Sequence, residues 1–188
     1  MIKNFFKSDV IKMISALAVV GVFSAITLVF VYEYSMPKIE ENIRRATDEG
    51  IKSIFPEADT VEEMKHKGVF EVRGQDKNLM GYAFIAEGNG YQGPIQVIAG
   101  VDPGLRTMTG LQILESQETP GLGAEIAGDF RKQFSGLSVV DEIECIKNRE
   151  PDKPGEIEAI TGATISSQAV VNMLNNRLAE LRDKLGVK

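Results

Sequence analysis

An unbroken apolar run dominates the hydrophobic pattern near the start of the chain. From Met13 to Tyr32, twenty consecutive residues carry no ionisable side chain. A helix rises about 1.5 Å per residue, so this run would span roughly 30 Å, the hydrocarbon thickness of a bilayer. We therefore predict a single transmembrane helix over residues 13–32, after a short head, residues 1–12. A cleaved signal peptide is the alternative, but its apolar core is normally only about 7–15 residues long and ends in a small-residue cleavage site.

The rest of the chain alternates between helical and strand-like periodicity. Apolar residues recur every three to four positions from Pro37 to Phe55, which predicts an amphipathic helix in a linker, residues 33–56, stopped by Pro56. Further on we expect strands at 69–73, 79–86, 95–101 and 108–115, a helix at 124–134, strands at 138–146 and 157–160, and a helix at 166–185. Strands first and helices later indicate an α+β domain over residues 57–188, with a mostly antiparallel sheet and packed helices that cover one face of it.

Charge gives this arrangement a direction. The head carries Lys3, Lys7 and Lys12 against Asp9, whereas the chain beyond the apolar run opens with Glu33. Basic flanks of transmembrane helices stay in the cytoplasm, so we expect a single-pass protein of the inner (cytoplasmic) membrane with an extracytoplasmic domain. The net charge of the chain is −6, and its acidic character argues against nucleic acid as a partner. Membrane lipid is the expected surrounding of the anchor.

The residues that usually carry catalysis are sparse. His66 is the single histidine and lies in a charged stretch, which is typical of a surface residue; Cys145 is the single cysteine and lies in a predicted strand, which is typical of a small core residue. A zinc site or a Ser-His-Asp triad would need ligands or partners that the sequence does not contain. We therefore expect no catalytic residue and no metal site.

A glycine pattern at Gly88-Asn89-Gly90-Tyr91-Gln92-Gly93 matches the GxGxxG spacing of dinucleotide-binding folds. Pro94 and a strand-like run follow it, so no helix begins there to hold a pyrophosphate. This excludes the Rossmann interpretation. Two interpretations remain, namely a simple glycine hairpin and glycines that let a ligand lie close to the backbone.

Two further motifs carry more information. The first, Thr161-Gly162-Ala163-Thr164-Ile165-Ser166-Ser167, stands between a short strand and the start of the last helix. Its hydroxyls and the unpaired N–H groups of a helix start form a site for an anion, most simply a phosphate, although plain N-capping by Ser166 or Ser167 explains the same residues. The second, Glu118-Thr119-Pro120-Gly121-Leu122-Gly123, is a Pro-Gly turn that begins with a carboxylate and alone is typical of a surface turn.

Both motifs, with Gly90-Tyr91-Gln92-Gly93-Pro94-Ile95 before them and one N-terminal anchor, resemble the G subunit family of Rnf-type ion-translocating electron-transport complexes. The resemblance spans the whole chain, and the FMN-binding domain of that family is shared with the C subunit of the sodium-translocating NADH:quinone oxidoreductase. It implies a flavoprotein for electron transport that is a redox subunit of a ferredoxin:NAD oxidoreductase, a translocase coupled to ion transport, and not catalytic alone. The other membrane and redox subunits are the partners it implies.

The resemblance also implies a covalent modification. In that family the last threonine of a Ser/Thr-Gly-Ala-Thr motif carries FMN through a phosphoester bond, which a separate flavin transferase makes from FAD. By position this threonine is Thr164, which makes the chain a phosphoprotein with covalent FMN. The other cofactor-binding residues that it implies are Thr161, Gly162, Ala163, Ile165, Ser166, Glu118, Thr119, Pro120, Gly121, Leu122 and Gly123. Among them, Thr119 is expected to hydrogen-bond and Leu122 to make an apolar contact.

Two positions depart from the family pattern. Glu158 stands where the family usually has an aspartate, three residues before the first Ser/Thr of the motif, and Ser116-Gln117 stand where members often carry a histidine. Three alternatives stay open. They are a C-type subunit of the quinone reductase, an anchored extracytoplasmic binding or assembly module without a redox role, and a free-FMN or stand-alone flavin reductase that binds flavin without the ester.

Overall fold

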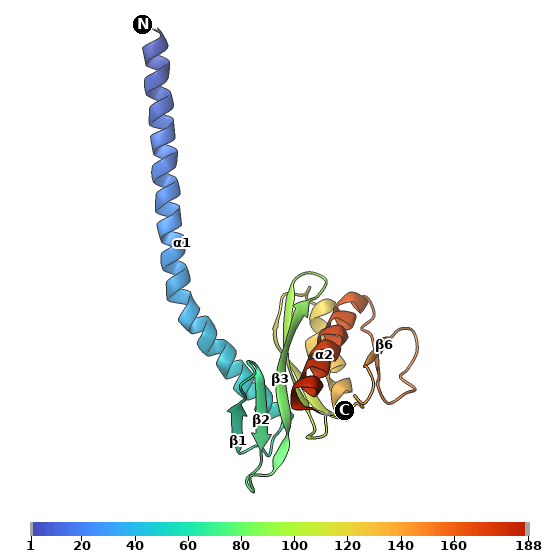
Figure 1. The fold of residues 1–188 in the computed structure, drawn as a ribbon. Coiled ribbons are helices and arrows are strands. Elements are labelled where there is room, and N and C mark those ends of the chain that lie inside the picture. Colours follow the sequence, from blue (N-terminus) through green and yellow to red (C-terminus); the bar gives the residue numbers. More distant parts are fainter. Residues whose placement is uncertain (1, 187–188) are drawn as a thin grey trace. The chain divides into compact units, whose positions relative to one another are not determined.

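The computed structural model describes residues 2–186 (Figure 1). In chain order it contains α1 (Ile2–Ile54), β1 (Thr60–Glu63), β2 (Val69–Arg73), β3 (Leu79–Asn89), β4 (Pro94–Val101), β5 (Met108–Ser116), the 3-10 helices η1 (Gly123–Ala127) and η2 (Asp129–Phe134), β6 (Glu144–Ile146), β7 (Glu156–Glu158) and α2 (Thr164–Leu185). The chain forms two compact units, Met1–Arg44 and Arg45–Lys188, which are described separately.

The first unit is the greater part of α1. Its stretch from Val10 onward is long and apolar enough to cross a membrane by length and composition, and none of that apolar window is buried. The sequence predicted two helices here, but α1 runs without interruption from Ile2 to Ile54 with Pro37 inside it. A proline removes one backbone hydrogen bond from a helix and does not have to end it, so the two expected helices are parts of one continuous helix.

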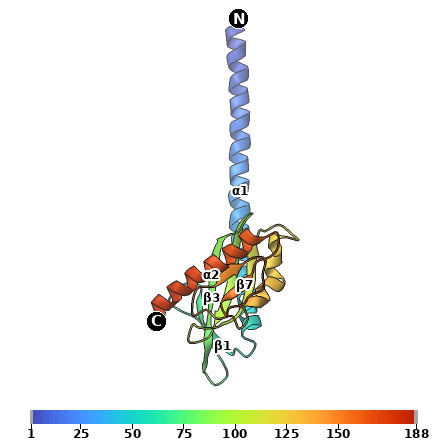
Figure 2. The same cartoon turned by 90° about the vertical axis from the view of Figure 1, so that its right-hand side faces the viewer.

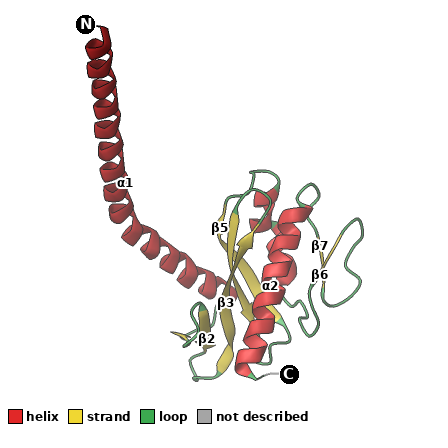
Figure 3. Cartoon of the chain, turned by 45° about the horizontal axis from the view of Figure 1, so that its top comes forward, coloured by secondary structure: helices red, strands yellow, loops and turns green. Residues whose placement is uncertain are grey.

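The second unit is built on a five-stranded antiparallel sheet in the order β1-β2-β3-β4-β5. Figure 3 shows these strands with α2 lying across them. The four predicted strands and their meander connection are confirmed. The edge strand β1 was not predicted, because all four of its residues are exposed and give no alternating pattern. The α+β class is confirmed.

Both faces of the sheet are covered, as successive side chains of β4 show by pointing into two different cores. Val97 and Ala99 belong to a core that α2 and the 3-10 helices complete, whereas Ile98 belongs to a second core with the end of α1. The second core consists of Ile51, Ile54, Phe55, Val72, Ala83 and Ile98. The view of Figure 2 shows α2 running diagonally over the sheet. The prediction that helices cover one face was therefore incomplete.

Three predicted elements differ in detail. The helix expected at 124–134 is two 3-10 helices, η1 and η2, with Gly128 between them in a non-helical conformation. The strand expected at 138–146 shrinks to β6, which pairs in parallel with β7, while Ser138 makes only an isolated bridge to Thr107. The last helix begins at Thr164 rather than Ser166. A local pattern thus indicates that a helix or strand exists more reliably than it fixes the ends of that element.

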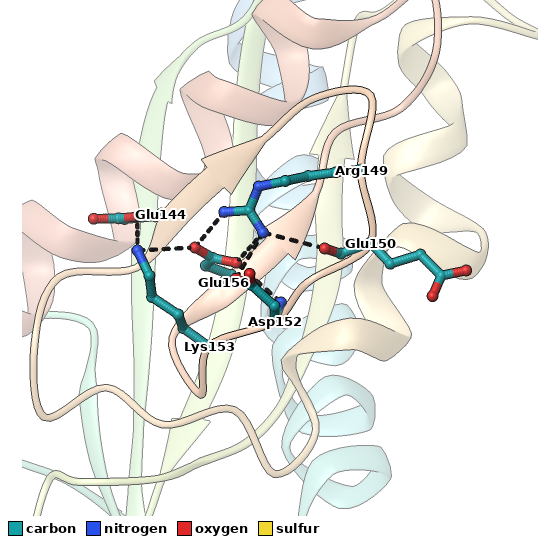
Figure 4. A network of polar contacts seen from close by, with 6 residues as sticks. All are labelled: Glu144, Arg149, Glu150, Asp152, Lys153 and Glu156. Atoms are coloured by element: carbon teal, nitrogen blue, oxygen red, sulfur yellow. Dashed lines mark hydrogen bonds and ion pairs between the residues drawn. The ribbon is translucent and has the colours of Figure 1, made fainter.

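A network of charges closes the loop between β6 and β7 (Figure 4). The buried carboxylate of Glu156 accepts hydrogen bonds from both terminal nitrogens of Arg149, at 2.7 and 2.5 Å, and from the backbone N–H of Asp152 at 3.1 Å. The ammonium of Lys153 lies 3.3 Å from it. These contacts, chiefly the bond from Arg149, hold the pKa of the Glu156 carboxyl far below its usual range.

This network predicts a specific loss of stability in acid. Because the pKa of Glu156 is lower in the folded chain than its ordinary value of 4.5, its ionisation stabilises the fold above that pH, and the contribution disappears as the pH falls towards the lowered value. We expect urea midpoints of the full-length protein in detergent to fall less between pH 5 and pH 3 for Glu156→Gln than for the wild type. The exposed Glu150→Gln variant is the control, and a wild-type pH dependence in Glu156→Gln would contradict the assignment.

The close contact of the end of α1 with the sheet predicts a second effect. A Cβ at Gly100 would overlap Thr109 Oγ1 and Ile54 Cγ2 and lie 2.7 Å from the ring of Phe55, whereas at Gly110, its partner on β5, the nearest atom is 3.5 Å away. We expect Gly100→Ala to lower the free energy of unfolding by about 1–3 kcal/mol and Gly110→Ala to change it little. Equal losses in urea unfolding would show that α1 does not pack as described.

Candidate functional site

The two sequence motifs meet in a pocket of about 400 Å³ at the start of α2. Its lining residues are Tyr91, Glu118, Thr119, Leu122, Gly123, Gly162, Ala163, Thr164, Ile165 and Ser166. Nine of the twelve residues expected to bind the cofactor are among them, and the other three, Thr161, Pro120 and Gly121, belong to the adjoining turns without lining the pocket. Tyr91, from the turn between β3 and β4, was quoted in a motif but not predicted as a site residue.

A tight turn shapes one wall of the pocket. Pro120 and Gly121 occupy its two central positions, Gly121 has a φ of +75°, and the N–H of Leu122 donates to the carbonyl of Thr119 at 3.2 Å. These are the residues and the positive φ that a type II turn requires. The turn leaves the side chain of Leu122 about half exposed in the pocket.

A similar turn forms the opposite wall, just before α2. Gly162 has a φ of +83°, and the N–H of Ala163 donates to the carbonyl of Ile160 at 3.0 Å. A Cβ at Gly162 would lie 3.3 Å from Cδ2 of Leu122, so the two turns stand against each other. The positive φ favours glycine at position 162, and a Cβ there would also have to displace the end of the Leu122 side chain slightly.

The start of α2 presents its unpaired N–H groups at this pocket. The first intrahelical bond is donated by the N–H of Ser167 to the carbonyl of Ala163, so the N–H groups of Thr164, Ile165 and Ser166 have no acceptor within the helix. Ala163 is the N-cap and makes no side-chain capping bond. N-capping by Ser166 or Ser167, the alternative explanation of these residues, was therefore wrong, and the positive end of the helix dipole remains available to an anion.

The hydroxyl groups near the pocket differ in what they bond. The Ser166 hydroxyl donates to Glu118 at 2.7 Å, the Thr119 hydroxyl donates to the side-chain oxygen of Gln92, and the Ser167 hydroxyl donates to the carbonyl of Ala163 at 3.1 Å. Within residues 2–186, the half-buried Thr164 hydroxyl has no hydrogen-bond partner. It is thus the aliphatic hydroxyl of the pocket that remains free to react or to bind a ligand.

A buried carboxylate is the main charge of the pocket. Glu118 is 7% exposed, and its two oxygens accept from the backbone N–H of Gln92 at 3.0 Å and from the hydroxyl of Ser166. Burial raises the pKa of Glu118, but these hydrogen bonds, with contributions from the N–H groups of Tyr91 and Gly93, outweigh it and lower the pKa below its ordinary value. Glu118 is therefore ionised at neutral pH.

Three exposed side chains around the pocket are apolar or aromatic. Tyr91 is 72% exposed, Leu122 48% and Ile165 58%. Such exposure is costly for a group of side chains unless they contact something else. With the helix start beside them, they suit a ligand that combines an anionic group with a flat, largely apolar part.

A larger groove of about 940 Å³ lies between β3 and α2 and shares Ile165 with this pocket. The guanidinium of Arg177, which lines it, donates to the carbonyls of Ile85 and Lys67 and to the carboxylate of Glu180. The smaller pocket is the candidate site because residues of both sequence motifs line it, whereas the groove takes only Ile165 from them.

The remaining reactive residues lie elsewhere. His66 is exposed, and Cys145 is partly buried against the main core, where burial raises the pKa of its thiol. Among the residues that the structure describes, no cluster of three or more His, Cys, Asp or Glu side chains is placed to hold an ion.

Comparison with known proteins adds to this geometry. The FMN-binding domain family matches residues 90–179, a range that contains both motifs. The chain is 34% identical over 179 residues to the G subunit of the ion-translocating oxidoreductase complex of Methanosarcina acetivorans, a match that covers 89% of this chain and 92% of that protein. It is 41% identical over 87 residues to the G subunit of the Na(+)-translocating ferredoxin:NAD(+) oxidoreductase complex of Acetobacterium woodii, which covers 46% of this chain and 42% of that protein.

The crystal structure of NqrC from Shewanella oneidensis has a similar fold. It superimposes with a TM-score of 0.56 at 19% identity, over 66% of this chain and 67% of that one, which supports the α+β architecture. The resemblance stated from the motifs is confirmed by the Methanosarcina relative, since their similarity extends along nearly the full length of both chains. The chain belongs to the G subunit family of ion-translocating oxidoreductase complexes.

Proposed function

We propose that the chain is the membrane-anchored electron-transfer subunit of an Rnf-type ferredoxin:NAD oxidoreductase complex, and that it carries FMN on Thr164 through a phosphoester bond. The observation that carries this proposal is the free hydroxyl of Thr164 at the start of α2, in a pocket lined by both motifs. The names of the Methanosarcina and Acetobacterium relatives support the assignment to such a complex. No observation favours a binding module without a redox role.

The residues of the pocket fit FMN in two respects. A phosphate on the Thr164 oxygen would lie beside the N–H groups of Thr164, Ile165 and Ser166, where the helix dipole favours negative charge. Tyr91, Leu122 and Ile165 would provide apolar contact for the ring system. Bound FMN supplies one- and two-electron chemistry, and the protein positions it.

Attachment of FMN would be a phosphoryl transfer catalysed by a separate flavin transferase. The Thr164 oxygen forms a bond to the FMN phosphorus of FAD, the pyrophosphate bond of FAD breaks, AMP leaves, and the hydroxyl proton passes to a base of the transferase or to water. Glu158, which replaces the usual aspartate, is exposed, and its backbone is fixed by two hydrogen bonds with Gln133. Its carboxylate is therefore accessible to a transferase that recognises the motif.

The anchor completes the proposal. We infer that residues 13–32 cross the cytoplasmic membrane, with residues 1–12 in the cytoplasm and the FMN-binding domain outside, among the other membrane and redox subunits of the complex. The basic head and the apolar window of α1 support this. A covalent bond would keep the cofactor in place in a compartment where no pool of free FMN replaces it.

The proposed bond has a direct test. Protein produced together with a flavin transferase, denatured and run on a gel, should show flavin fluorescence under ultraviolet light and a mass increased by one FMN minus one water. Thr164→Ala should abolish both signals, because it removes the acceptor oxygen. Thr60→Ala, which removes an exposed hydroxyl in β1, is the control. Flavin that separates from the wild-type chain on denaturation would refute the covalent bond.

The proposed orientation has its own test. In a Cys145→Ser background, which removes the single cysteine, Asp76→Cys places a thiol in the exposed turn between β2 and β3. We expect a membrane-impermeant maleimide to label this variant in intact spheroplasts, whereas Ser8→Cys in the head should be labelled only after lysis. The reverse pattern would mean that the domain faces the cytoplasm.

A further inference from the structure

We propose that Glu118 is a positioning residue: its carboxylate fixes the first turn of α2 so that the Thr164 hydroxyl is presented for phosphoryl transfer. This inference rests on the proposed function, because it concerns the attachment of FMN to Thr164. It assigns Glu118 a role through Ser166 and the backbone rather than through contact with the flavin.

The first argument is the connectivity of the carboxylate. One oxygen accepts from the N–H of Gln92, 26 residues earlier, and the other accepts from the hydroxyl of Ser166, 48 residues later. Three segments of the site, namely the turn after β3, the loop after β5 and the start of α2, are thereby joined through one side chain. Ser166 follows Thr164 by two positions in the same helical turn, so fixing Ser166 fixes Thr164.

The second argument is steric. A Cβ at Gly90 would overlap one oxygen of Glu118, and a Cβ at Gly123 would overlap the other and lie 2.9 Å from the Ser166 oxygen. Neither glycine has a φ in the left-handed region, so their backbone conformation does not require glycine. Glycine at both positions is instead explained by the space that Glu118 occupies, together with Ile95 Cδ1, which would lie 2.6 Å from a Cβ at Gly90. The absence of side chains at Gly90 and Gly123 thus leaves room for the Glu118 carboxylate in one position, as expected for a residue that positions its neighbours.

The third argument is which hydroxyl remains free. An ionised carboxylate only accepts hydrogen bonds, so the hydroxyl of Ser166 must donate to it and its proton is committed. Ser166 is also only 1% exposed. The buried Ser166 hydroxyl is thus occupied by Glu118, and the half-buried hydroxyl of Thr164 is the accessible acceptor in this turn.

The test is the rate at which purified transferase, FAD and Mg²⁺ attach FMN to the full-length chain in detergent. We expect Glu118→Ala to lower kcat by about 10- to 100-fold, the loss typical of a misplaced reacting group, with the KM for FAD unchanged because the transferase binds FAD. Glu118→Gln should stay within about threefold of the wild type, since its amide oxygen still accepts from Gln92 and its NH₂ group can donate to Ser166. Glu115→Gln, an exposed carboxylate three residues away, is the matched control.

A second measurement separates positioning from general loss of stability. If Glu118 acts through Ser166, the double variant Glu118→Ala/Ser166→Ala should be no slower than Glu118→Ala alone, within about twofold, because the two changes break the same contact. Additive losses would overturn the inference, as would a wild-type rate in Glu118→Ala or an equally slow Glu118→Gln. If Glu118→Ala does not fold, the rates of FMN attachment to Ser166→Ala and Glu118→Gln test the inference instead. We then expect Ser166→Ala to be slow and Glu118→Gln to be close to the wild type. A wild-type rate in Ser166→Ala, or a slow Glu118→Gln, would overturn the inference. Labelling of the wild type but not of Thr164→Ala tests the proposed function independently.

Discussion

The loop after β5 and the first turn of α2 are 48 residues apart in the sequence, and the contact that joins them is the hydrogen bond from Ser166 to the ionised Glu118. The carboxylate is buried, so its charge must be compensated by fixed donors, and the backbone of the Gly90–Gly93 turn supplies them. The geometry of the pocket depends on this compensation of the Glu118 charge, because hydrogen bonds to a buried anion fix the positions of their donors more narrowly than apolar contacts do.

The sheet makes this contact possible by bringing the ends of its strands together. β3 leads into the turn with Tyr91 and Gln92, β5 ends at Ser116 just before Glu118, and α2 packs on the face completed by Val97 and Ala99. The start of α2 is thus fixed by two kinds of contact, the packing of α2 against the main core and the hydrogen bond from Ser166 to Glu118. The network around Glu156 closes the loop before β7, so the segment that leads to Thr164 is also anchored at its beginning.

The sequence predicted the parts of this molecule that follow from local periodicity. The strands β2 to β5 are apolar runs bounded by turn residues and were placed well, whereas β1 is exposed throughout and gives no such signal. Pro37 and Gly128 show the limits of local rules, because a proline stayed inside a helix and a glycine divided one. Both motifs of the site were recognised, but the bond between Glu118 and Ser166 joins distant segments, and no local pattern contains it. The steric reason for Gly90 and Gly123 also could not be predicted, because it depends on where the fold places the Glu118 side chain.

The position of Glu118 also bears on why the proposed cofactor would be covalently attached. A helix start offers only about half a unit of positive charge, worth about 0.3–1 kcal/mol to an exposed anion. In this site the carboxylate of Glu118 lies beside the first turn of α2, bonded to the hydroxyl of Ser166, while the N–H groups of that turn stay unpaired within the helix. A free FMN phosphate would have to bind beside that negative charge with weak compensation, and Tyr91, Leu122 and Ile165 are too exposed to enclose the ring. With a phosphoester to Thr164, retention of the flavin no longer depends on whether attraction of the phosphate to the helix start exceeds its repulsion by Glu118. The pocket then only has to orient the flavin. The rigid, negatively charged Glu118 can therefore fix the start of α2 even though a phosphate is carried beside it.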